Sequence, residues 1–288
     1  MNGLFIGLTT LDLIYLTDHF PRNNEKIVAI DETISAGGPA TNAAITFKYF
    51  GNQATLLSVI GNHPISKLIY AELNDHSIDI FDLNPYQQKP LSTSSIIVSK
   101  ATGERAVVSV NATKSKAIVN NRLFLKKLQD IDVILVDGHQ ISTSIIIAKE
   151  AQRLKIPVVL DGGSWKPELP KVLPYVNYAI CSENFYPPNC LNSLDVFHYL
   201  KEIKIPYIAI TKGANPVQYW TKEESGNVEV SNIKAVDTLG AGDIFHGAFC
   251  HFILKHNFKD SIAKASQVAS IACQYFGPRQ WMSKIVND

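Results

Sequence analysis

The chain has 288 residues, 46% of them hydrophobic and 18% charged, and its formal net charge is +1. This length and composition exclude a disordered chain, and the near-neutral charge excludes a broad nucleic-acid or membrane-surface footprint. The four cysteines form no CxxC pair and no apolar run reaches the roughly 20 residues of a membrane span, so we expect free thiols and a cytoplasmic protein.

Short β-branched runs alternate along the chain with longer amphipathic stretches. The predicted strands are 4–8, 54–60, 131–136, 157–160 and 207–211, and the predicted helices are 40–50, 66–76, 143–154, 194–203 and 241–256. Continuous apolar runs such as IDVILV and YIAIT are typical of strands that are covered on both faces. The alternation predicts a single α/β domain over 1–288, built on a doubly wound, mostly parallel sheet.

Two regions depart from this alternation. Residues 25–35 and 92–110 have the pattern of antiparallel strands, and the ATGE sequence at 101–104 is a hairpin signal. Because no helical stretch is available to cover them, we predict a small β-sheet lid with strands at approximately 12–35 and 90–111. Arg105, in the hairpin, is either a residue that reaches over the substrate or an exposed charge. The last residues, 283–288, are predicted to be a tail.

Polar side chains follow several of the predicted strands. Ligands of open α/β sheets bind outside the carboxyl ends of the strands, so residues at that edge are candidates for a site. The residues concerned are Asp12 after the first strand, Asp137, Asp161 and Thr211. Several such residues at one edge indicate a binding site rather than ordinary turns.

The most informative motif is DTLGAGD at residues 237–243. Gly240 and Gly242 flank Ala241, and an apolar helical pattern follows at once. Glycines let the backbone approach a ligand closely, and a helix N-terminus offers free N–H groups and a positive dipole to an anion. An ordinary capped helix start would also place an acidic residue, Asp243, in the first turn. The motif is not a Walker A loop, because no GK[ST] follows.

The whole string, with Phe245 and the GAF sequence at 247–249, closely resembles the C-terminal signature of the ribokinase-like (PfkB) carbohydrate kinases. The resemblance implies that residues 240–242 form an anion hole for the transferred phosphoryl group. It also implies that Asp243 takes the proton from the attacking hydroxyl. Phosphoryl transfer depends on positioning, on charge stabilisation and on a base aligned with the nucleophile, and this assignment supplies each of them.

The sequence GGPATN at residues 37–42 resembles the N-terminal signature of the same family, in which a Gly-Gly turn leads into a helix. The resemblance implies that Gly38 and Asn42 bind sugar hydroxyls. It implies that Asp12 accepts hydrogen bonds from the same substrate. A carboxylate that accepts two such bonds suits a polyol.

Further segments extend the resemblance over nearly the whole chain. Thr211 and Gly213 match a loop near the nucleotide phosphates, where Gly240 and Gly242 also lie, and residues 265–277 match the helix and loop beside the adenine. The resemblance therefore implies ATP with Mg²⁺ as the phosphoryl donor. It also implies a homodimer formed through the lid as an expected assembly.

A monovalent-cation site is also implied by the resemblance. Asp237 would supply the charge, and the carbonyl groups of Leu239 and Gly277 would complete the ligands. Potassium is the expected ion. Asp237 would then hold the loop that shapes the anion hole.

One departure from the family pattern concerns magnesium. Many members have Asn-x-x-Glu after the fifth core strand, whereas this chain has Ser182-Glu-Asn-Phe185. The terminal glutamate is missing, so magnesium binding by this loop is not expected. Versions with serine occur in the ketohexokinase-like branch, which makes that branch a candidate for this chain.

The resulting hypothesis is a kinase acting on a hexose, ketohexose or pentose. The alternatives are a nucleoside kinase of the same fold and a non-catalytic sugar-binding relative. No basic residues cluster near Asp12 or Asn42 in the sequence, so a phosphosugar substrate is not expected. A nicotinamide dehydrogenase would require GxGxxG after the first strand, which Gly3 and Gly7 do not supply.

Overall fold

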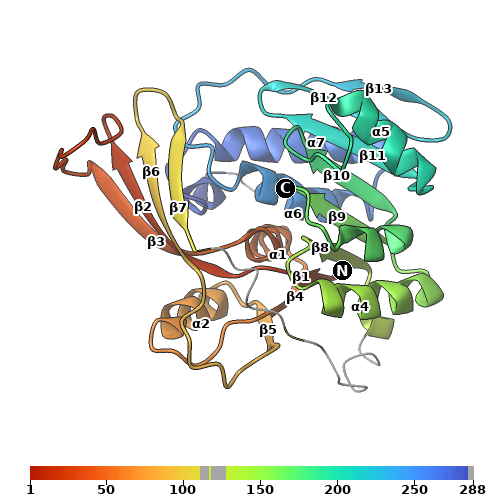
Figure 1. Ribbon diagram of the computed structural model, residues 1–288, viewed down its shortest axis with the longest axis horizontal. Coiled ribbons are helices and arrows are strands. Elements are labelled where there is room, and N and C mark those ends of the chain that lie inside the picture. The colour runs from red at the N-terminus through yellow and green to blue at the C-terminus, as the bar shows by residue number, and fades with distance from the viewer. Residues whose placement is uncertain (111–116, 118–127, 285–288) are drawn as a thin grey trace.

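The computed structural model describes residues 1–110, 117 and 128–284 (Figure 1). Its larger sheet has nine strands, which in spatial order are β13 (Ser225–Val228), β12 (Asn215–Trp220), β11 (Tyr207–Lys212), β10 (Tyr178–Ser182), β9 (Val158–Gly162), β8 (Val133–Val136), β1 (Asn2–Ile6), β4 (Gln53–Ser58) and β5 (Asp79–Asp82). Neighbours from β11 to β5 are parallel, and β12 and β13 are antiparallel additions at one edge. The predicted mostly parallel sheet is confirmed.

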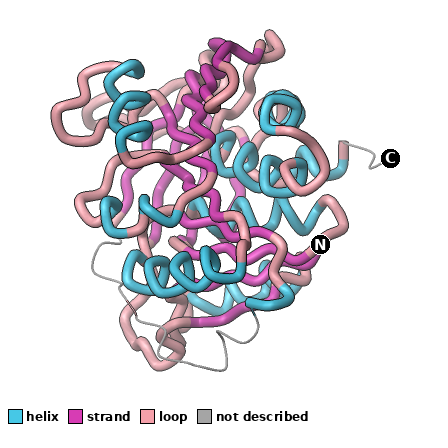
Figure 2. The backbone as a smooth tube through the Cα atoms, turned by 90° about the vertical axis from the view of Figure 1, so that its right-hand side faces the viewer, coloured by secondary structure: helices cyan, strands magenta, loops and turns pink. Residues whose placement is uncertain are grey.

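Helices cover both faces of the larger sheet, as Figure 2 shows. One face carries α1 (Pro39–Tyr49), α2 (Ser66–Asp75), α6 (Ala241–Phe252), α7 (Phe258–Ala272) and the short helix η5 (Gln280–Ser283). The other carries α4 (Ile141–Leu154), α5 (Ser193–Glu202) and the short helices η2 (Leu128–Asp130), η3 (Leu169–Lys171) and η4 (Leu173–Tyr175). Within β1, Phe5 packs on the first face whereas Leu4 and Ile6 pack on the second. Alternate side chains of a strand point to opposite faces, which explains the continuous apolar runs.

A second, four-stranded sheet projects from the domain at the left of Figure 1. Its spatial order is β3 (Asp31–Gly37), β2 (Thr10–Thr17), β6 (Thr93–Ser99) and β7 (Arg105–Ser109). Ile14, Ile96 and Phe276 belong to a small apolar cluster on one face, while β7 is exposed along its length. The predicted small sheet is confirmed, with the turn between β6 and β7 where the hairpin signal was found.

Three sequence-based expectations differ from the structure or lie outside it. The first strand ends at Ile6, and Asp12 lies within β2 of the smaller sheet rather than after the first strand. The apolar N-terminal run contains two strands, β1 and β2, which belong to different sheets. Residues 25–30 are not in a strand, and Ser283 ends η5 rather than beginning a tail. Residue 111 of the predicted lid segment and residues 285–288 of the predicted tail lie outside the described residues.

Two expectations from composition can be compared with the structure directly. The four cysteines are free thiols, as expected. None of the helices in the described residues combines the length and the apolar character that crossing a bilayer requires.

Helices α1 and α6 pack closely against each other beside the larger sheet (Figure 1). Gly247 of α6 makes this approach possible, because a Cβ atom there would collide with the Ala43 carbonyl oxygen and would lie 2.7 Å from Thr46 Cβ. The N-terminal turns of the two helices are thereby held side by side. These turns carry Asn42 and Asp243.

Candidate active site

The DTLGAGD segment forms the loop and first turn that begin α6. Gly240 is the residue before the helix and has φ of 71°, a left-handed conformation that glycine adopts without strain. The first amides of a helix have no partner within it, so the backbone of residues 241–243 can donate hydrogen bonds to a ligand. Gly242 is exposed, and no atom outside its own helix backbone and its chain neighbours lies within 4 Å of the position that a Cβ would take. This turn has the geometry of an anion site.

Asp243 lies in the same first turn and contacts the neighbouring helix. Its Oδ2 accepts a hydrogen bond of 2.7 Å from Asn42 Nδ2. Burial raises the pKa of Asp243 well above the ordinary value for a carboxyl, and the negative charge of Asp161 raises it further. The bond from Asn42 and the nearby His246 act in the opposite direction. A carboxylate with a raised pKa is a stronger base than one in water, as expected for a group that accepts a proton.

Gly38 and Asn42 open helix α1 as the GGPATN motif predicted. Gly38 precedes the helix with φ of 97°, and a Cβ there would collide with the Leu8 carbonyl oxygen. Asn42 is buried, and its two polar atoms contact different partners: Nδ2 donates to Asp243, and Oδ1 accepts from Arg279 Nη1 at 2.8 Å. The structure therefore brings Asn42 and Asp243 together, although 201 residues separate them.

Asp12 reaches the site from the smaller sheet. Its carboxylate occupies the space beside Gly37 that any larger side chain would fill, and it accepts a bond of 2.7 Å from Thr10 Oγ1. Burial raises the pKa of Asp12, which the Thr10 and Ser94 hydroxyls and the charge of Arg279 oppose. Asp12 thus lies near the N-terminus of α1, but it is part of β2 and does not follow the first strand as the sequence suggested.

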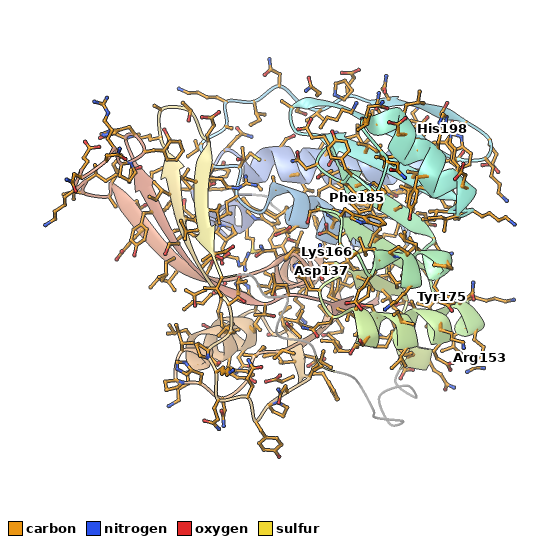
Figure 3. The ribbon with its side chains drawn as sticks, in the orientation of Figure 1. Asp137, Arg153, Lys166, Tyr175, Phe185 and His198 are labelled. Atoms are coloured by element: carbon orange, nitrogen blue, oxygen red, sulfur yellow. The ribbon has the colours of Figure 1, made fainter. Side chains whose placement is uncertain are left out.

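Two further carboxylates lie at the carboxyl edge of the larger sheet. Asp137 follows β8 and Asp161 is in β9, and both charges act on Asp243. Burial opposes ionisation of Asp137, but His139 and Lys166 hold its pKa at about 2. Figure 3 shows Lys166 beside Asp137. The edge therefore combines several negative charges with one lysine that the sequence did not single out.

The carboxylate of Asp237 joins two loops. It is buried, Oδ1 accepts from the Leu239 amide at 2.8 Å, and Oδ2 accepts from the Gly277 amide at 2.9 Å. Burial raises the pKa of Asp237, and the two amide hydrogen bonds, followed by the charge of Arg105, oppose this rise. The three residues proposed for a monovalent cation are thus adjacent.

Thr211 and Gly213 lie at the end of β11, which three strands separate from β1. Gly213 has φ of 59° in the turn between β11 and β12. The structure places these residues on the same edge as Asp137 and Asp161. It does not place them against the Asn42–Asp243 pair.

The loop after β10 confirms the departure noted in the sequence. Phe185 is buried and its ring packs against Trp165 at a centroid distance of 5.5 Å. Ser182 Oγ donates to the Gly163 carbonyl oxygen at 2.8 Å, and Glu183 is exposed. The residue at the end of this loop is therefore an aromatic ring in the core, and Glu183 is the carboxylate of the loop that faces solvent.

Arg105 is bound to the signature loop. Its Nη1 donates to both the carbonyl oxygen and the Oγ1 of Thr238, each at 2.9 Å. Thr238 Oγ1 also lies 3.4 Å from the Gly103 carbonyl oxygen. The turn of the smaller sheet is thus connected to the residues just before the anion site. Arg105 is exposed, which agrees with the second of the two roles considered for it.

Sequence reasoning missed Arg279, which follows Gly277-Pro278. It lies next to Asn42 in space, and its charge acts on Asp12. The expectation concerned a cluster of basic residues near these positions in the sequence, and the structure adds one arginine that is distant in sequence but close in space. In the sequence, Arg279 is a single arginine two residues before Trp281, and it belongs to no recognisable motif.

Comparisons with known proteins show the family and the fold of the chain. The chain matches the pfkB family carbohydrate kinase over residues 3–285. A ribokinase of Dictyostelium discoideum is 27% identical, over 96% of this chain and 95% of that protein. A ribokinase structure from Thermotoga maritima has a TM-score of 0.76 at 20% identity, covering 98% of both chains. An Arabidopsis thaliana ribokinase structure, complexed with ribose and ATP, has a TM-score of 0.76 at 18% identity, covering 96% of this chain and 93% of that one.

Proposed function

We propose that the chain phosphorylates a neutral sugar and that Asp243 is the base. The premise is that the chain belongs to the pfkB family of carbohydrate kinases, and is therefore a phosphotransferase acting with ATP on a sugar or nucleoside. One observation carries the proposal: the hydrogen bond between Asn42 and Asp243 joins the helix proposed to bind the sugar to the helix proposed to activate it. The surrounding carboxylates favour an uncharged acceptor, since they would repel a phosphosugar.

The proposed reaction uses each part of this edge. Asp12, Gly38 and Asn42 hold the sugar hydroxyls, and Asp243 takes the proton of the attacking hydroxyl. The amides at 240–242 stabilise the transferred phosphoryl group, and the end of β11 at Thr211 and Gly213 contacts the nucleotide. Magnesium arrives with ATP and shields the phosphate charge. No ligand for it is assigned to the loop at 182–185.

The proposal is tested by measuring ADP release with MgATP and a panel of neutral pentoses, hexoses and ketohexoses, nucleosides and phosphosugars. Turnover of a neutral sugar is the expected result. Turnover of nucleosides alone would replace the sugar by the nucleoside alternative, and no turnover with any acceptor would leave a non-catalytic sugar-binding protein.

Replacing the proposed sugar ligands should weaken sugar binding specifically. Asp12→Ala and Asn42→Ala are each expected to raise the sugar KM about 5- to 150-fold, because a substrate hydroxyl loses its partner. The KM for ATP should change little. Asn42→Ala should also lower kcat, since Asn42 contacts Asp243. The measurement is steady-state kinetics with each substrate varied in turn.

Asp31→Ala is a matched control for these variants, because Asp31 is an exposed carboxylate in the same smaller sheet as Asp12. Its kinetic constants should equal those of the wild type. An unchanged sugar KM in Asp12→Ala, or a rise in the ATP KM instead, would remove Asp12 from the sugar site.

Potassium is expected to stimulate turnover about 5-fold or more over tetramethylammonium at equal ionic strength. The reason is that a monovalent cation would balance the buried charge of Asp237 and order the loops of Leu239 and Gly277 beside the anion hole. Asp237→Asn should abolish the difference between the two salts. Equal wild-type rates in both salts would rule out the cation site.

A further inference from the structure

The Arg279 side chain connects three elements around the proposed site, α2, β3 and α1. Its Nε donates to Glu72 Oε1 of α2 at 3.0 Å, Nη2 donates to the Ala36 carbonyl oxygen of β3 at 2.6 Å, and Nη1 donates to Asn42 Oδ1 of α1 at 2.8 Å. The side chain is only 17% exposed, and Glu72 also accepts from the Ala36 amide. A guanidinium with this many fixed partners is held in one orientation.

These contacts determine how the Asn42 amide is oriented. A guanidinium has only donors, so the atom of Asn42 that faces Arg279 must be the oxygen. An ionised carboxylate has only acceptors, so the atom that faces Asp243 must be the nitrogen. The two neighbours demand the same orientation, which the observed distances of 2.8 and 2.7 Å satisfy. Without Arg279, the Asn42 oxygen would lose this partner, and of the two neighbours only Asp243 would still constrain the amide.

We infer that Arg279 is a positioning residue for phosphoryl transfer: it orients the Asn42 amide so that Asn42 donates to Asp243 and holds the base in place. This inference rests on the proposed role of Asp243. It extends that role to a residue that is 237 positions from Asn42 and contacts neither the anion turn nor Asp243 by a hydrogen bond.

The charges around Asp243 indicate in which direction its pKa should change when Arg279 is replaced. Asp161 of β9 and Asp137 after β8 raise its pKa beyond the effect of burial, while the bond from Asn42 and the charge of His246 lower it. The positive charge of Arg279 interacts with Asp243 and also with the negative charges of Glu72 and Asp12. Loss of the Asn42 bond should therefore raise the pKa of Asp243 further. A larger fraction of the base is then protonated at a given pH, so activity falls first on the acid side.

Arg279→Lys is the main test, because it keeps the positive charge but a single ammonium cannot reach Glu72, Ala36 and Asn42 together. We expect kcat at pH 7 to fall about 10-fold and the acid limb of the pH–kcat profile to move about one pH unit upward. The matched control is Arg153→Lys on the exposed surface of α4, where Arg153 pairs with Glu150. Its profile should coincide with that of the wild type (Figure 3 marks Arg153).

A second measurement does not require turnover. Titration of the Asp243 carboxyl by ¹³C NMR, with the signal assigned by its loss in Asp243→Asn, should give a higher midpoint in Arg279→Lys than in the wild type. An unchanged midpoint in folded Arg279→Lys would overturn the inference and leave Arg279 as a link between the smaller sheet and the domain. If the wild type phosphorylates no acceptor, the proposed function fails, while the titration still decides the role of Arg279.

For Glu72→Gln, the Asp243 midpoint is not expected to rise, in contrast to Arg279→Lys. Arg279 keeps its bond to Asn42 there and loses the anion that offsets its charge. The Asp243 midpoint should therefore stay or move to lower pH. A shift to higher pH in Glu72→Gln would contradict the inference even if Arg279→Lys did not fold.

Discussion

Asp243→Asn is expected to lower kcat by about 10²–10⁴-fold, because the amide cannot accept the proton of the attacking hydroxyl. The substitution keeps the size of the side chain and an oxygen that can accept the bond from Asn42 Nδ2. Steady-state kinetics on the best sugar acceptor measure the loss. Binding of ATP should change much less, since the base is assigned to the acceptor rather than to the nucleotide. A variant with near-normal kcat would remove Asp243 from the mechanism.

The role of Asp243 as the base also predicts how the kcat and the stability of the wild type depend on pH. Because burial and Asp161 raise the pKa of Asp243 above its usual 3.8, the base ionises only as the pH rises through this raised value, and kcat should rise with it. Stability should change in the opposite direction, since the folded protein binds the proton more tightly than the unfolded chain does. Ionised Asp243 therefore costs stability at neutral pH, and the unfolding temperature of Asp243→Asn should equal or exceed that of the wild type.

Gly242→Val is expected to reduce turnover at least about 10²-fold, the scale on which an anion-stabilising group acts. Apart from the two neighbouring residues and the backbone of its own helix, no protein atom lies within 4 Å of the position that its Cβ would take, so the side chain would occupy open space in front of the helix N-terminus. Phosphate oxygens would approach through that space. The fold should survive, because nothing in the protein has to move, and circular dichroism and thermal unfolding would check this.

Gly247→Val is the matched control, five residues further along the same helix. A Cβ there would collide with the Ala43 carbonyl oxygen, so α1 and α6 would be forced apart. We expect a loss of about 1–3 kcal/mol in stability, as for other overpacked cores. If Gly242→Val instead lost stability and kept its activity, the anion role of this turn would be contradicted.

Much of the fold was predictable because the physical cause was local. Runs such as IDVILV must be buried on both faces, and only a central strand with helices on each side satisfies this, as β8 does. The DTLGAGD motif likewise determines its own turn, since Gly240 supplies the left-handed residue that begins α6. In both cases the residues that determine the structure are neighbours in the chain.

The errors had a different origin. Asp12 was assigned to the end of the first strand because β1 and β2 are both apolar, and nothing in the sequence marks the change from one sheet to the other between Ile6 and Thr10. Arg279 was overlooked because its partners, Asn42 and Ala36, are more than 230 residues away. A sequence pattern reports on turns and faces. It does not report on which distant side chains meet.

The hydrogen bonds from Asn42 to Asp243 and from Arg279 to Ala36 span 201 and 243 residues of chain. Contacts between residues so far apart in the sequence form late in folding. The entropic cost of closing a long loop must be overcome before such a contact can stabilise the structure. Helices such as α4 and the hairpin of β6 and β7 depend only on nearby residues. During refolding, helical content should therefore return before catalytic competence, and the period between the two includes the assembly of this site.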